Sequence, residues 1–564
     1  MSGNQETEKI YFARTNYRNE RVTFGIKKKD RTKHMYVIGK TGMGKTTLLE
    51  NMAVQDIRNG EGLAIVDPHG SFVEKILDYV PKERVKDVVY LNPCDVNFPI
   101  AFNIMEDIGA DQRHLVASGL MGVFKKMWPD VWSARMEYIL NNAILALLEY
   151  PKATLLGINR MLADKDFRKE VVSNVSDPVI KAFWQQEFAK YTERFAAEAT
   201  PAIQNKVGQF TSNPLIRNII GQPKSSFDFR KVMDERKIVL INLSKGKIGE
   251  LNSQLIGAMI ITKIYLAAMS RAKDTGVELP DFYLYVDEFQ NFATESFKDI
   301  LSEARKYGLA LILAHQYIAQ MEEGVRDAVF GNVGTHIAFR VGPADAEVLE
   351  TEFNPEFTAD DIVNLGLAVV YLKLSIDGVP SRPFSATTLP PIERKGESHR
   401  KEIIEFSRKN YCNSKEDVEK VISSWHEPIS SSVKISEDKK KSEEEEVKGP
   451  KLFEAECSVC GKKIVVPFEP DKKRPIFCPK HRSYLTSSPQ APQPQKTQQP
   501  QSGNLSLREL GQKTTVFHKD FQKKKEKATP DFKGLRELLA DIAPQKKKEE
   551  GEKILKPGES VKFN

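Results

Sequence analysis

Met35-Tyr-Val-Ile38 is an apolar run that leads directly into the octapeptide Gly39-Lys-Thr-Gly-Met-Gly-Lys-Thr46. The octapeptide fits the pattern G-x-x-x-x-G-K-[ST], in which glycines let successive backbone N–H groups turn toward phosphate oxygens. Apolar residues at helical spacing follow it, at Leu48, Leu49, Met52, Ala53 and Ile57. A strand, a glycine-rich loop and a helix in this order predict a nucleoside triphosphate site rather than an ordinary glycine turn.

The chemistry of this P-loop gives each of its residues a part. We expect Lys45 to reach the β- and γ-phosphates and Thr46 to ligate Mg²⁺. The helix that begins near Gly44 adds the positive end of its dipole. The residues expected to contact the nucleotide are Gly39, Lys40, Thr41, Gly42, Met43, Gly44, Lys45, Thr46, Thr47 and Asp67.

Asp67 stands at the end of a second apolar run, Gly62-Leu-Ala-Ile-Val-Asp67. The carboxyl ends of parallel strands form the edge where such sheets place ligands, so this carboxylate could face the nucleotide or a neighbouring subunit. The alternative is structural: Asp67-Pro-His-Gly70 could be a turn that caps the next helix. The sequence leaves both open.

Length and composition predict a soluble protein of several domains. The chain has 564 residues, 40% of them hydrophobic and 29% charged, and its formal net charge of +7 permits contact with nucleic acid without requiring it. Its five cysteines do not suggest a disulfide framework, so we expect a cytoplasmic location. The best candidate for a membrane span, 255–269, is interrupted by Thr262 and Lys263, and we expect no transmembrane anchor.

Short continuous apolar strands alternate with helices, which is typical of a mainly parallel sheet covered on both faces. We therefore predict an α/β fold, a RecA-like P-loop NTPase split by an all-α insertion. The expected segments are an N-terminal β layer and first part of the ATPase domain at 1–104, the insertion at 105–230, the second part of the ATPase domain at 231–395, a helical extension at 396–429, a linker at 430–449, a zinc ribbon at 450–485, a Pro/Gln-rich linker at 486–504 and a basic tail with short docking helices at 505–564.

Two further strand ends carry polar residues that hydrolysis needs. Phe282-Tyr-Leu-Tyr-Val286 runs into Asp287 and Glu288, the pattern of a Walker B strand. Asp287 would support the Mg²⁺ and Glu288 would polarise the attacking water, whereas the structural alternative is a strand-end cap. The run Leu309-Ala-Leu-Ile-Leu-Ala-His-Gln316 ends in Gln316, which could sense the γ-phosphate or simply face solvent.

Near the carboxyl end, Cys457-Ser-Val-Cys460 is followed after seventeen residues by Cys478-Pro-Lys-His481. Two ligand pairs at this separation suit tetrahedral Zn²⁺, and unrelated thiols are the alternative. Because Cys457, Cys460, Cys478 and His481 would fill all four positions, the predicted zinc site is structural.

Together these motifs resemble the FtsK–HerA superfamily of DNA-pumping ATPases, over about 20–390 of the chain. The matching segments are Asp30-Arg31, the P-loop, Val66-Asp-Pro-His-Gly70, Trp132-Ser-Ala-Arg-Met-Glu-Tyr138, Tyr285-Val-Asp-Glu-Phe-Gln290 and Ala314-His-Gln316. Within the superfamily the chain looks most like the HerA-like helicases and the conjugative coupling proteins of type IV secretion. Its cysteine pattern is similar to zinc ribbons of the CxxC-x17-CxxC type, with His481 in place of the fourth cysteine.

The resemblance implies a homo-hexameric ring with nucleotide sites between subunits and DNA in a central channel. It also implies an arginine, supplied by the neighbouring subunit, that stabilises charge on the transferring phosphoryl group. Arg340 is the first choice for it, with Arg305 and Arg326 as alternatives, and an ordinary salt bridge is the structural interpretation. Without the amino-terminal transmembrane pair of anchored coupling proteins, a role at a secretion pore would need recruitment.

The leading hypothesis is an ATP-hydrolysing DNA translocase whose catalytic residues are Lys45, Glu288, Gln316 and Arg340. The first alternative is a HerA-type helicase that works at DNA ends with a nuclease. The second is an ATP-switched scaffold that recruits partners through its zinc ribbon and tail. A relaxase, secretion or nuclease partner could dock on the tail at 505–564.

Overall fold

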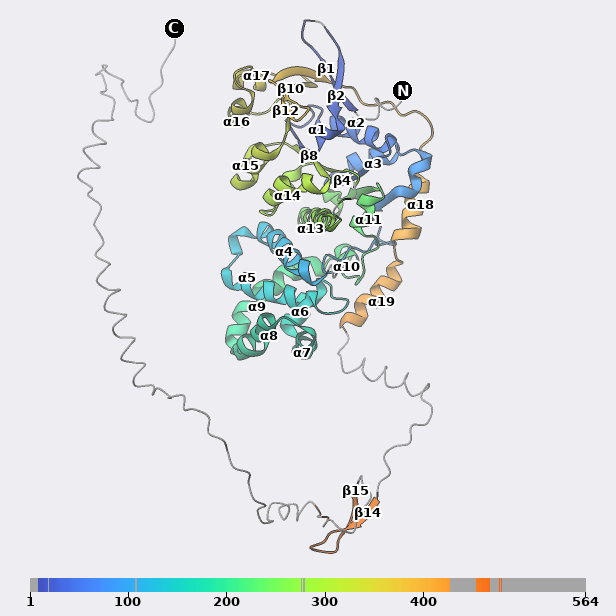
Figure 1. The fold of residues 1–564 in the computed structure, drawn as a ribbon, viewed down its shortest axis with the longest axis vertical. Coiled ribbons are helices and arrows are strands. Elements are labelled where there is room, and N and C mark those ends of the chain that lie inside the picture. The colour runs from blue at the N-terminus through green and yellow to red at the C-terminus, as the bar shows by residue number, and fades with distance from the viewer. Residues whose placement is uncertain are drawn as a thin grey trace, which may run out of the picture. The chain divides into compact units, whose positions relative to one another are not determined.

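The computed structural model describes residues 9–18, 20–106, 109–274, 276, 279–426, 453–466, 476 and 478 (Figure 1). The chain divides into two compact units, Met1–Glu445 and Glu446–Asn564. The linkers expected at 430–449 and 486–504 and the tail expected at 505–564 lie outside the described residues.

A sheet of eleven strands forms the centre of the first unit, in the order β2-β1-β13-β10-β9-β3-β8-β7-β4-β6-β5. The last seven are mutually parallel: β9 (Thr335–Ala338), β3 (Met35–Ile38), β8 (Leu309–His315), β7 (Phe282–Val286), β4 (Gly62–Asp67), β6 (Ile238–Asn242) and β5 (Val88–Leu91). Every residue of these seven strands is buried, because helices cover both faces. The predicted α/β fold with a mainly parallel sheet is confirmed.

The other four strands extend the same sheet with antiparallel pairings: β10 (Val369–Lys373), β13 (Phe384–Thr388), β1 (Lys9–Thr15) and β2 (Thr23–Lys27). The sequence indicated a small β layer before the P-loop strand, but β1 and β2 are the outer strands of the main sheet. Strand β13 was not expected, because its residues Phe-Ser-Ala-Thr-Thr lack a continuous apolar run. A short hairpin, β11 (Ser375–Ile376) and β12 (Val379–Pro380), stands apart from the main sheet.

The strands send alternate side chains into two separate hydrophobic cores. In β3, Met35 and Val37 join the core beneath α2 (Lys45–Arg58) and α3 (Ser71–Leu77). Tyr36 and Ile38 point the other way, into the core shared with α13 (Glu250–Ser270) and the helical insertion. The two-residue period of a strand produces this division and fixes which helices cover which face.

The helical insertion lies between β5 and β6 in the chain, and Figure 1 shows α13 between its helices and the sheet. It comprises α4 (Arg113–Met127), α5 (Ala134–Leu148), α6 (Leu156–Ala163), α7 (Lys165–Asn174), α8 (Pro178–Ala182), α9 (Glu193–Thr211), α10 (Pro214–Ile220) and α11 (Phe229–Asp234). Helices α4 and α13 pack closely, since a Cβ added at Gly119 would lie 2.5 Å from Cγ2 of Thr262. The insertion therefore rests on the helix that covers the sheet.

Helix α13 is also long and apolar enough to cross a membrane by length and composition, the one such segment among the described residues. However, 67% of its apolar window is buried inside the protein, against the sheet and α4. That burial is what a core helix of a large α/β domain shows.

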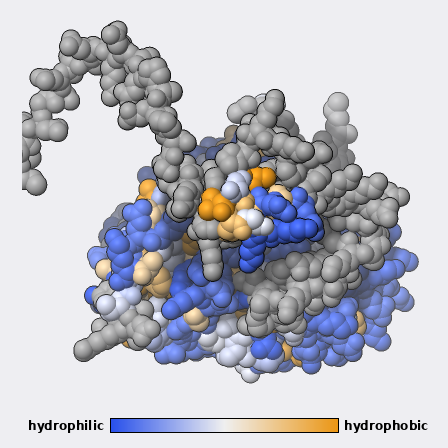
Figure 2. Space-filling model, turned by 90° about the horizontal axis from the view of Figure 1, so that it is seen from below, coloured by the Kyte–Doolittle hydropathy of each residue, from blue (hydrophilic) through white to orange (hydrophobic). Residues whose placement is uncertain are grey.

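The remaining helices lie around the sheet, except α19 (Lys415–His426), which packs against α10 of the insertion. The others are α1 (Lys28–Arg31), α12 (Lys245–Ile248), α14 (Phe297–Glu303), α15 (Glu323–Asn332), α16 (Pro343–Phe353), α17 (Ala359–Val363) and α18 (Arg400–Tyr411). Helix α18 lies beside β5, where the Ser407 hydroxyl accepts a hydrogen bond from Tyr90 N at 3.0 Å. In the space-filling view of Figure 2, hydrophilic side chains dominate the coloured surface and hydrophobic ones occur in small groups.

The second unit contains an antiparallel hairpin, β14 (Phe453–Glu456) and β15 (Lys463–Val466). Its turn carries Cys457 and Cys460, the first pair of predicted zinc ligands.

Candidate nucleotide and metal sites

Three neighbouring strands bring the predicted catalytic residues to one edge of the sheet. Strand β8 lies between β3 and β7 and is parallel to both, with Ile38 opposite His315 and Val286 opposite Leu313. The P-loop, Gln316 and the pair Asp287–Glu288 follow directly on these strand ends. The carboxyl edge of a parallel sheet is where ligands bind in such folds.

Hydrogen bonds that the P-loop donates to residues at the ends of neighbouring strands shape it. Gly39 N donates to His315 O at 3.3 Å, and Lys40 N donates to Arg340 O at 2.8 Å. Gly42 and Gly44 have φ angles of +79° and +114°, a region that side chains rarely allow. Gly39 has no room for a side chain, because a Cβ there would lie 2.5 Å from Cβ of Phe339.

Lys45 fills the centre of the loop. It is buried, and its Nζ donates to Gly39 O at 2.5 Å and to Lys40 O at 3.3 Å. Burial lowers the pKa of this ammonium group, while the nearby Glu288 and Asp287 act in the opposite direction. Carbonyl oxygens thus solvate a buried cation at the point where a nucleotide would present phosphate oxygens instead.

Asp287 is a buried carboxyl group next to other acidic groups. Burial, followed by the proximity of Asp67 and Glu288, raises its pKa to about 7, against the opposing effect of Lys45. Carboxylate and hydroxyl oxygens are the ligands that Mg²⁺ prefers, and Thr46 stands in the first turn of α2. The donor set therefore fits a magnesium ion, which would neutralise the excess negative charge.

For Asp67 the structure favours the structural alternative. Its Oδ1 accepts from His69 N at 2.8 Å, and its Oδ2 accepts from Phe72 N at 2.8 Å and Val73 N at 3.1 Å. Both oxygens are thus occupied by the turn and the first turn of α3. Asp67 also acts on the site electrostatically, since its proximity raises the pKa of Asp287. Direct contact of Asp67 with nucleotide stays a prediction.

Glu288 occupies an unusual backbone position. Its φ of +47° and ψ of +52° lie in the left-handed region, and its N donates to Oδ1 of Asp287 at 3.0 Å. Its Oε2 accepts from Nε2 of Gln290 at 2.7 Å. Backbone strain of this kind in a non-glycine residue is common where a side chain has to be aimed.

Gln316 lies where the sequence expected a sensor. Its Nε2 donates to the hydroxyl of Thr41 in the P-loop. The residue that follows β8 therefore contacts the loop that follows β3. The amide is partly exposed, which leaves it accessible to a bound phosphate.

The three candidate arginines differ in position. Arg340 lies against the P-loop of its own chain through its carbonyl oxygen. Arg305 is exposed and precedes β8, at the opposite edge of the sheet from the P-loop. Arg326 pairs with Asp327 at 3.2 Å and Glu323 at 3.7 Å on α15. Action on a neighbour's site stays a prediction for all three.

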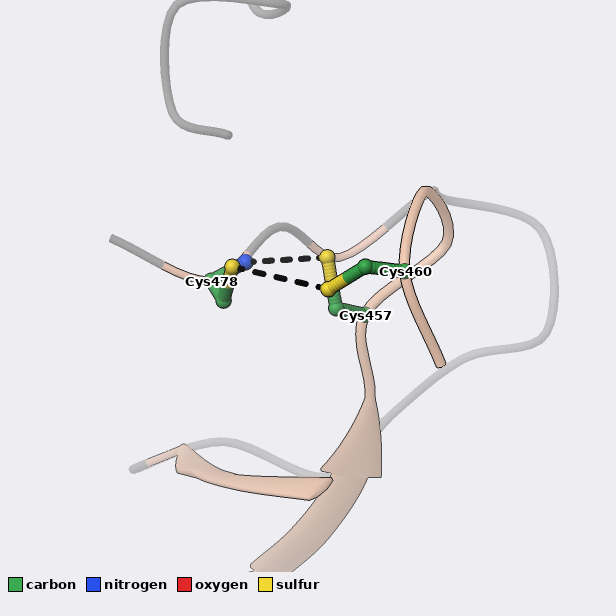
Figure 3. Close-up of side chains that lie close together, drawn as sticks. All are labelled: Cys457, Cys460 and Cys478. Atoms are coloured by element: carbon green, nitrogen blue, oxygen red, sulfur yellow. Dashed lines mark hydrogen bonds between the residues drawn. The ribbon is translucent and has the colours of Figure 1, made fainter. Parts of the chain in front are cut away.

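In the second unit, three of the four predicted zinc ligands converge (Figure 3). The sulfur atoms of Cys457, Cys460 and Cys478 all lie within 4.8 Å of one another, and Cys478 N donates to Cys457 Sγ at 3.3 Å. Such a set of thiols suits zinc. His481, the predicted fourth ligand, lies outside the described residues.

Two residues near the nucleotide site received no role from the sequence. Gln290 belongs to the segment Tyr285–Gln290 that carries the resemblance, yet nothing in the pattern shows that its amide reaches Glu288. Lys126 of α4 donates to the carbonyl oxygens of Gln290, at 2.6 Å, and Ala293. A contact between residues 164 positions apart leaves no local signal in a single sequence.

Comparison with known proteins gives two family matches. Residues 20–352 match the family described as type IV secretion-system coupling protein DNA-binding domain, and residues 451–480 match a probable treble clef zinc finger. The zinc-binding class of the second segment agrees with the prediction, but the matched type is a treble clef rather than the expected ribbon. No curated protein matches the chain.

Several solved structures are similar to this chain. Plasmid coupling protein TrwB in complex with the non-hydrolysable GTP analogue GDPNP is 14% identical, with a TM-score of 0.50, over 71% of this chain and 94% of that one. TrwB in complex with ADP and Mg²⁺ is 15% identical, with a TM-score of 0.48, over 72% and 95%. VirB4 of Thermoanaerobacter pseudethanolicus is 14% identical, with a TM-score of 0.44, over 69% and 97%. At such identities the first of these similarities supports the fold alone.

Proposed function

The chain belongs to the family of type IV secretion-system coupling protein DNA-binding domains, and we propose that it works as an ATP-driven DNA translocase. One observation carries the ATPase part: the P-loop, Gln316 and Asp287–Glu288 stand at the ends of three adjacent parallel strands. A protein that only bound nucleotide would not need a buried aspartate, a half-buried glutamate and a glutamine beside the phosphate loop.

Each residue has a distinct part in this mechanism. On nucleotide binding, the Nζ of Lys45 would exchange its carbonyl partners for phosphate oxygens, and Thr46 and Asp287 would hold the Mg²⁺. Glu288 orients and deprotonates the attacking water, and Gln316 contacts the γ-phosphate or that water. Magnesium supplies charge neutralisation on the β- and γ-phosphates. The TrwB structures with GDPNP and with ADP and Mg²⁺ support this nucleotide and metal chemistry by analogy.

We propose that the motor is a homo-hexamer in which Arg340 acts on the neighbour's nucleotide. DNA contact is mainly to the phosphate backbone, so it is weakly specific for sequence and weakens steeply with salt. In the cytoplasm, the tail at 505–564 recruits a relaxase, secretion or nuclease partner. Cys457, Cys460, Cys478 and His481 bind a structural zinc ion.

Steady-state hydrolysis with and without DNA tests the proposal. Wild-type protein should hydrolyse ATP faster with DNA, and Glu288→Gln should bind ATP normally yet hydrolyse it at least about a hundredfold more slowly. Glu295→Gln, which changes an exposed glutamate seven residues further on, is the matched control and should hydrolyse at the wild-type rate. Normal hydrolysis by Glu288→Gln would remove Glu288 as the base. Slow hydrolysis without stimulation by DNA would favour the ATP-switched scaffold.

A HerA-type role in DNA-end processing predicts the same ATPase behaviour, so a second assay separates it from conjugation. A nuclease that co-purifies with the chain and cuts DNA in an ATP-dependent manner would favour end processing. A relaxase that binds the tail would favour conjugative transfer, in line with the coupling-protein family.

A further inference from the structure

The turn that follows Glu288 is fastened to the helical insertion. Lys126, near the end of α4, directs its Nζ to the carbonyl oxygens of Gln290, at 2.6 Å, and Ala293. Burial lowers the pKa of Lys126 to about 8, against the opposing effect of Glu322, which forms no ion pair with it among the described residues. Two main-chain carbonyls are therefore the partners that solvate this ammonium group, and the contact is specific.

More of α4 runs along the same segment. A Cβ at Gly122 would lie 3.7 Å from Oγ of Ser296 and 3.8 Å from Cβ of Thr294, so the backbone of α4 passes close to the chain there. Phe292 occupies the space left by the missing side chain of Gly257 in α13. The segment after Walker B is thus packed between α4 and α13, and a displacement of α4 cannot leave it in place.

Gln290 connects this segment to the general base. Its Nε2 donates to Oε2 of Glu288 at 2.7 Å, and its own Oε1 is buried without a hydrogen-bond partner among the described residues. A carboxylate only accepts hydrogen bonds, so the amide has to present its nitrogen to Glu288. The bond to Glu288 therefore fixes the orientation of the amide, and the amide in turn holds the carboxylate.

These contacts hold Glu288 in a left-handed backbone conformation. Such a conformation is unfavourable for a residue with a side chain, and it persists only where the surroundings impose it. Phe289 helps to impose it, since its ring packs in the core 5.1 Å from the ring of His315. Gln290 and Lys126 restrain the side chain and the following turn.

We propose that Gln290 and Lys126 are positioning residues for hydrolysis: Gln290 aims the Glu288 carboxylate, and Lys126 ties that aim to the position of the helical insertion. The inference rests on the proposed function, because it takes Glu288 as the general base. It assigns a route by which an event at the insertion, such as DNA binding, changes the rate of hydrolysis.

The test uses the full chain with Gln290→Met and Lys126→Met, which keep side-chain length and remove the donated hydrogen bonds. Each should lower kcat for ATP about ten- to a hundredfold, as a misplaced catalytic group does. The Kd for a fluorescent ATP analogue should change less than threefold, because neither residue touches the P-loop. Stimulation by DNA should shrink in Lys126→Met.

Lys125→Met is the matched control: Lys125 is the preceding residue, and its ion pair with Glu295 is long, at 3.8 Å, and exposed. It should keep wild-type kcat and stimulation.

A second readout does not depend on hydrolysis. Amide hydrogen exchange of residues 288–296 should be at least about tenfold faster in Lys126→Met than in wild type or Lys125→Met, with unchanged exchange in α2. If wild type hydrolyses no ATP, the proposed function fails, and the exchange result still decides whether Lys126 holds the turn. Unchanged kcat together with unchanged exchange overturns the inference. A rise in kcat for Gln290→Met also overturns it, since Gln290 would then restrain the base rather than aim it.

Discussion

Replacing Asp287 by asparagine should stabilise the protein at alkaline pH while it abolishes hydrolysis. Asparagine has the same shape and keeps the oxygen that accepts from Glu288 N at 3.0 Å. What it removes is a negative charge that the fold holds next to Asp67 and Glu288, away from water. Burial and these neighbours raise the pKa of Asp287 from 3.8 to about 7.

The sign of the pH dependence follows from proton binding. Between pH 4 and 7 the folded protein retains the Asp287 proton that the unfolded chain has released, so stability falls as the pH rises through this window. Raising the pKa from 3.8 to about 7 costs the folded protein about 4 kcal/mol of unfolding free energy once Asp287 is fully ionised, at about 1.36 kcal/mol for each tenfold change in proton affinity. About a third of that loss is already present at pH 5, and about 3 kcal/mol develops between pH 5 and 8.

Urea unfolding of the metal-free protein at both pH values measures this difference. The stability advantage of Asp287→Asn over wild type should grow by about 3 kcal/mol from pH 5 to pH 8. Asp299→Asn, which neutralises an exposed carboxylate on α14, is the control and should show no such growth. Mg²⁺ with ADP should stabilise wild type at pH 8 far more than the variant, because the ion binds the charged form. An advantage that stays constant with pH, or shrinks, would refute the argument that Asp287 carries uncompensated charge.

Three further outcomes follow from the geometry. Gly39→Ala should weaken binding of a fluorescent nucleotide at least about tenfold, because the new Cβ would lie 2.5 Å from Cβ of Phe339 and would push the loop off β3; wild-type affinity would show that the loop adapts. Gln316→Leu should lose its bond to Thr41 and lower kcat about ten- to a hundredfold with little change in nucleotide affinity, and an unchanged kcat would leave Gln316 a surface residue. A fragment of residues 450–485 should contain about one zinc ion per chain by metal analysis, and Cys457→Ser should lose most of it; a metal-free wild-type fragment would eliminate the site.

The parallel strands could be predicted because their sequences carry the signal by themselves. Strands β3, β4, β6, β7 and β8 are continuous apolar runs, buried on both faces, and β3, β7 and β8 lead directly into the P-loop, Asp287 and Gln316. Strand β13 could not be predicted, since hydrogen bonds to β10 and β1 make a strand of a segment rich in serine and threonine. The neighbouring strands, and not the local sequence pattern, determine that this segment forms a strand.

Asp67 shows a second reason why the role of a residue could not be predicted from the sequence. A carboxylate at a strand end is available both to a ligand and to the N–H groups of the next helix, and sequence spacing is the same in either case. The positions of Phe72 N and Val73 N, 2.8 and 3.1 Å from Oδ2, favour the cap. Asp287 differs because the chain turns into the left-handed region at the next residue, which keeps N–H groups of a new helix away from it.

That difference explains how one edge of the sheet holds two buried carboxylates with different tasks. Asp67 accepts hydrogen bonds from three backbone N–H groups, which engage both of its oxygens in the turn and in the first turn of α3. Asp287 receives one such bond, from Glu288 N, and its pKa is raised by burial and by the proximity of Asp67 and Glu288. A cation beside Asp287 would offset this excess of acidic groups. A magnesium ion bound with nucleotide would relieve this repulsion, so metal binding would be coupled to the loss of a proton at Asp287, beside the proposed general base.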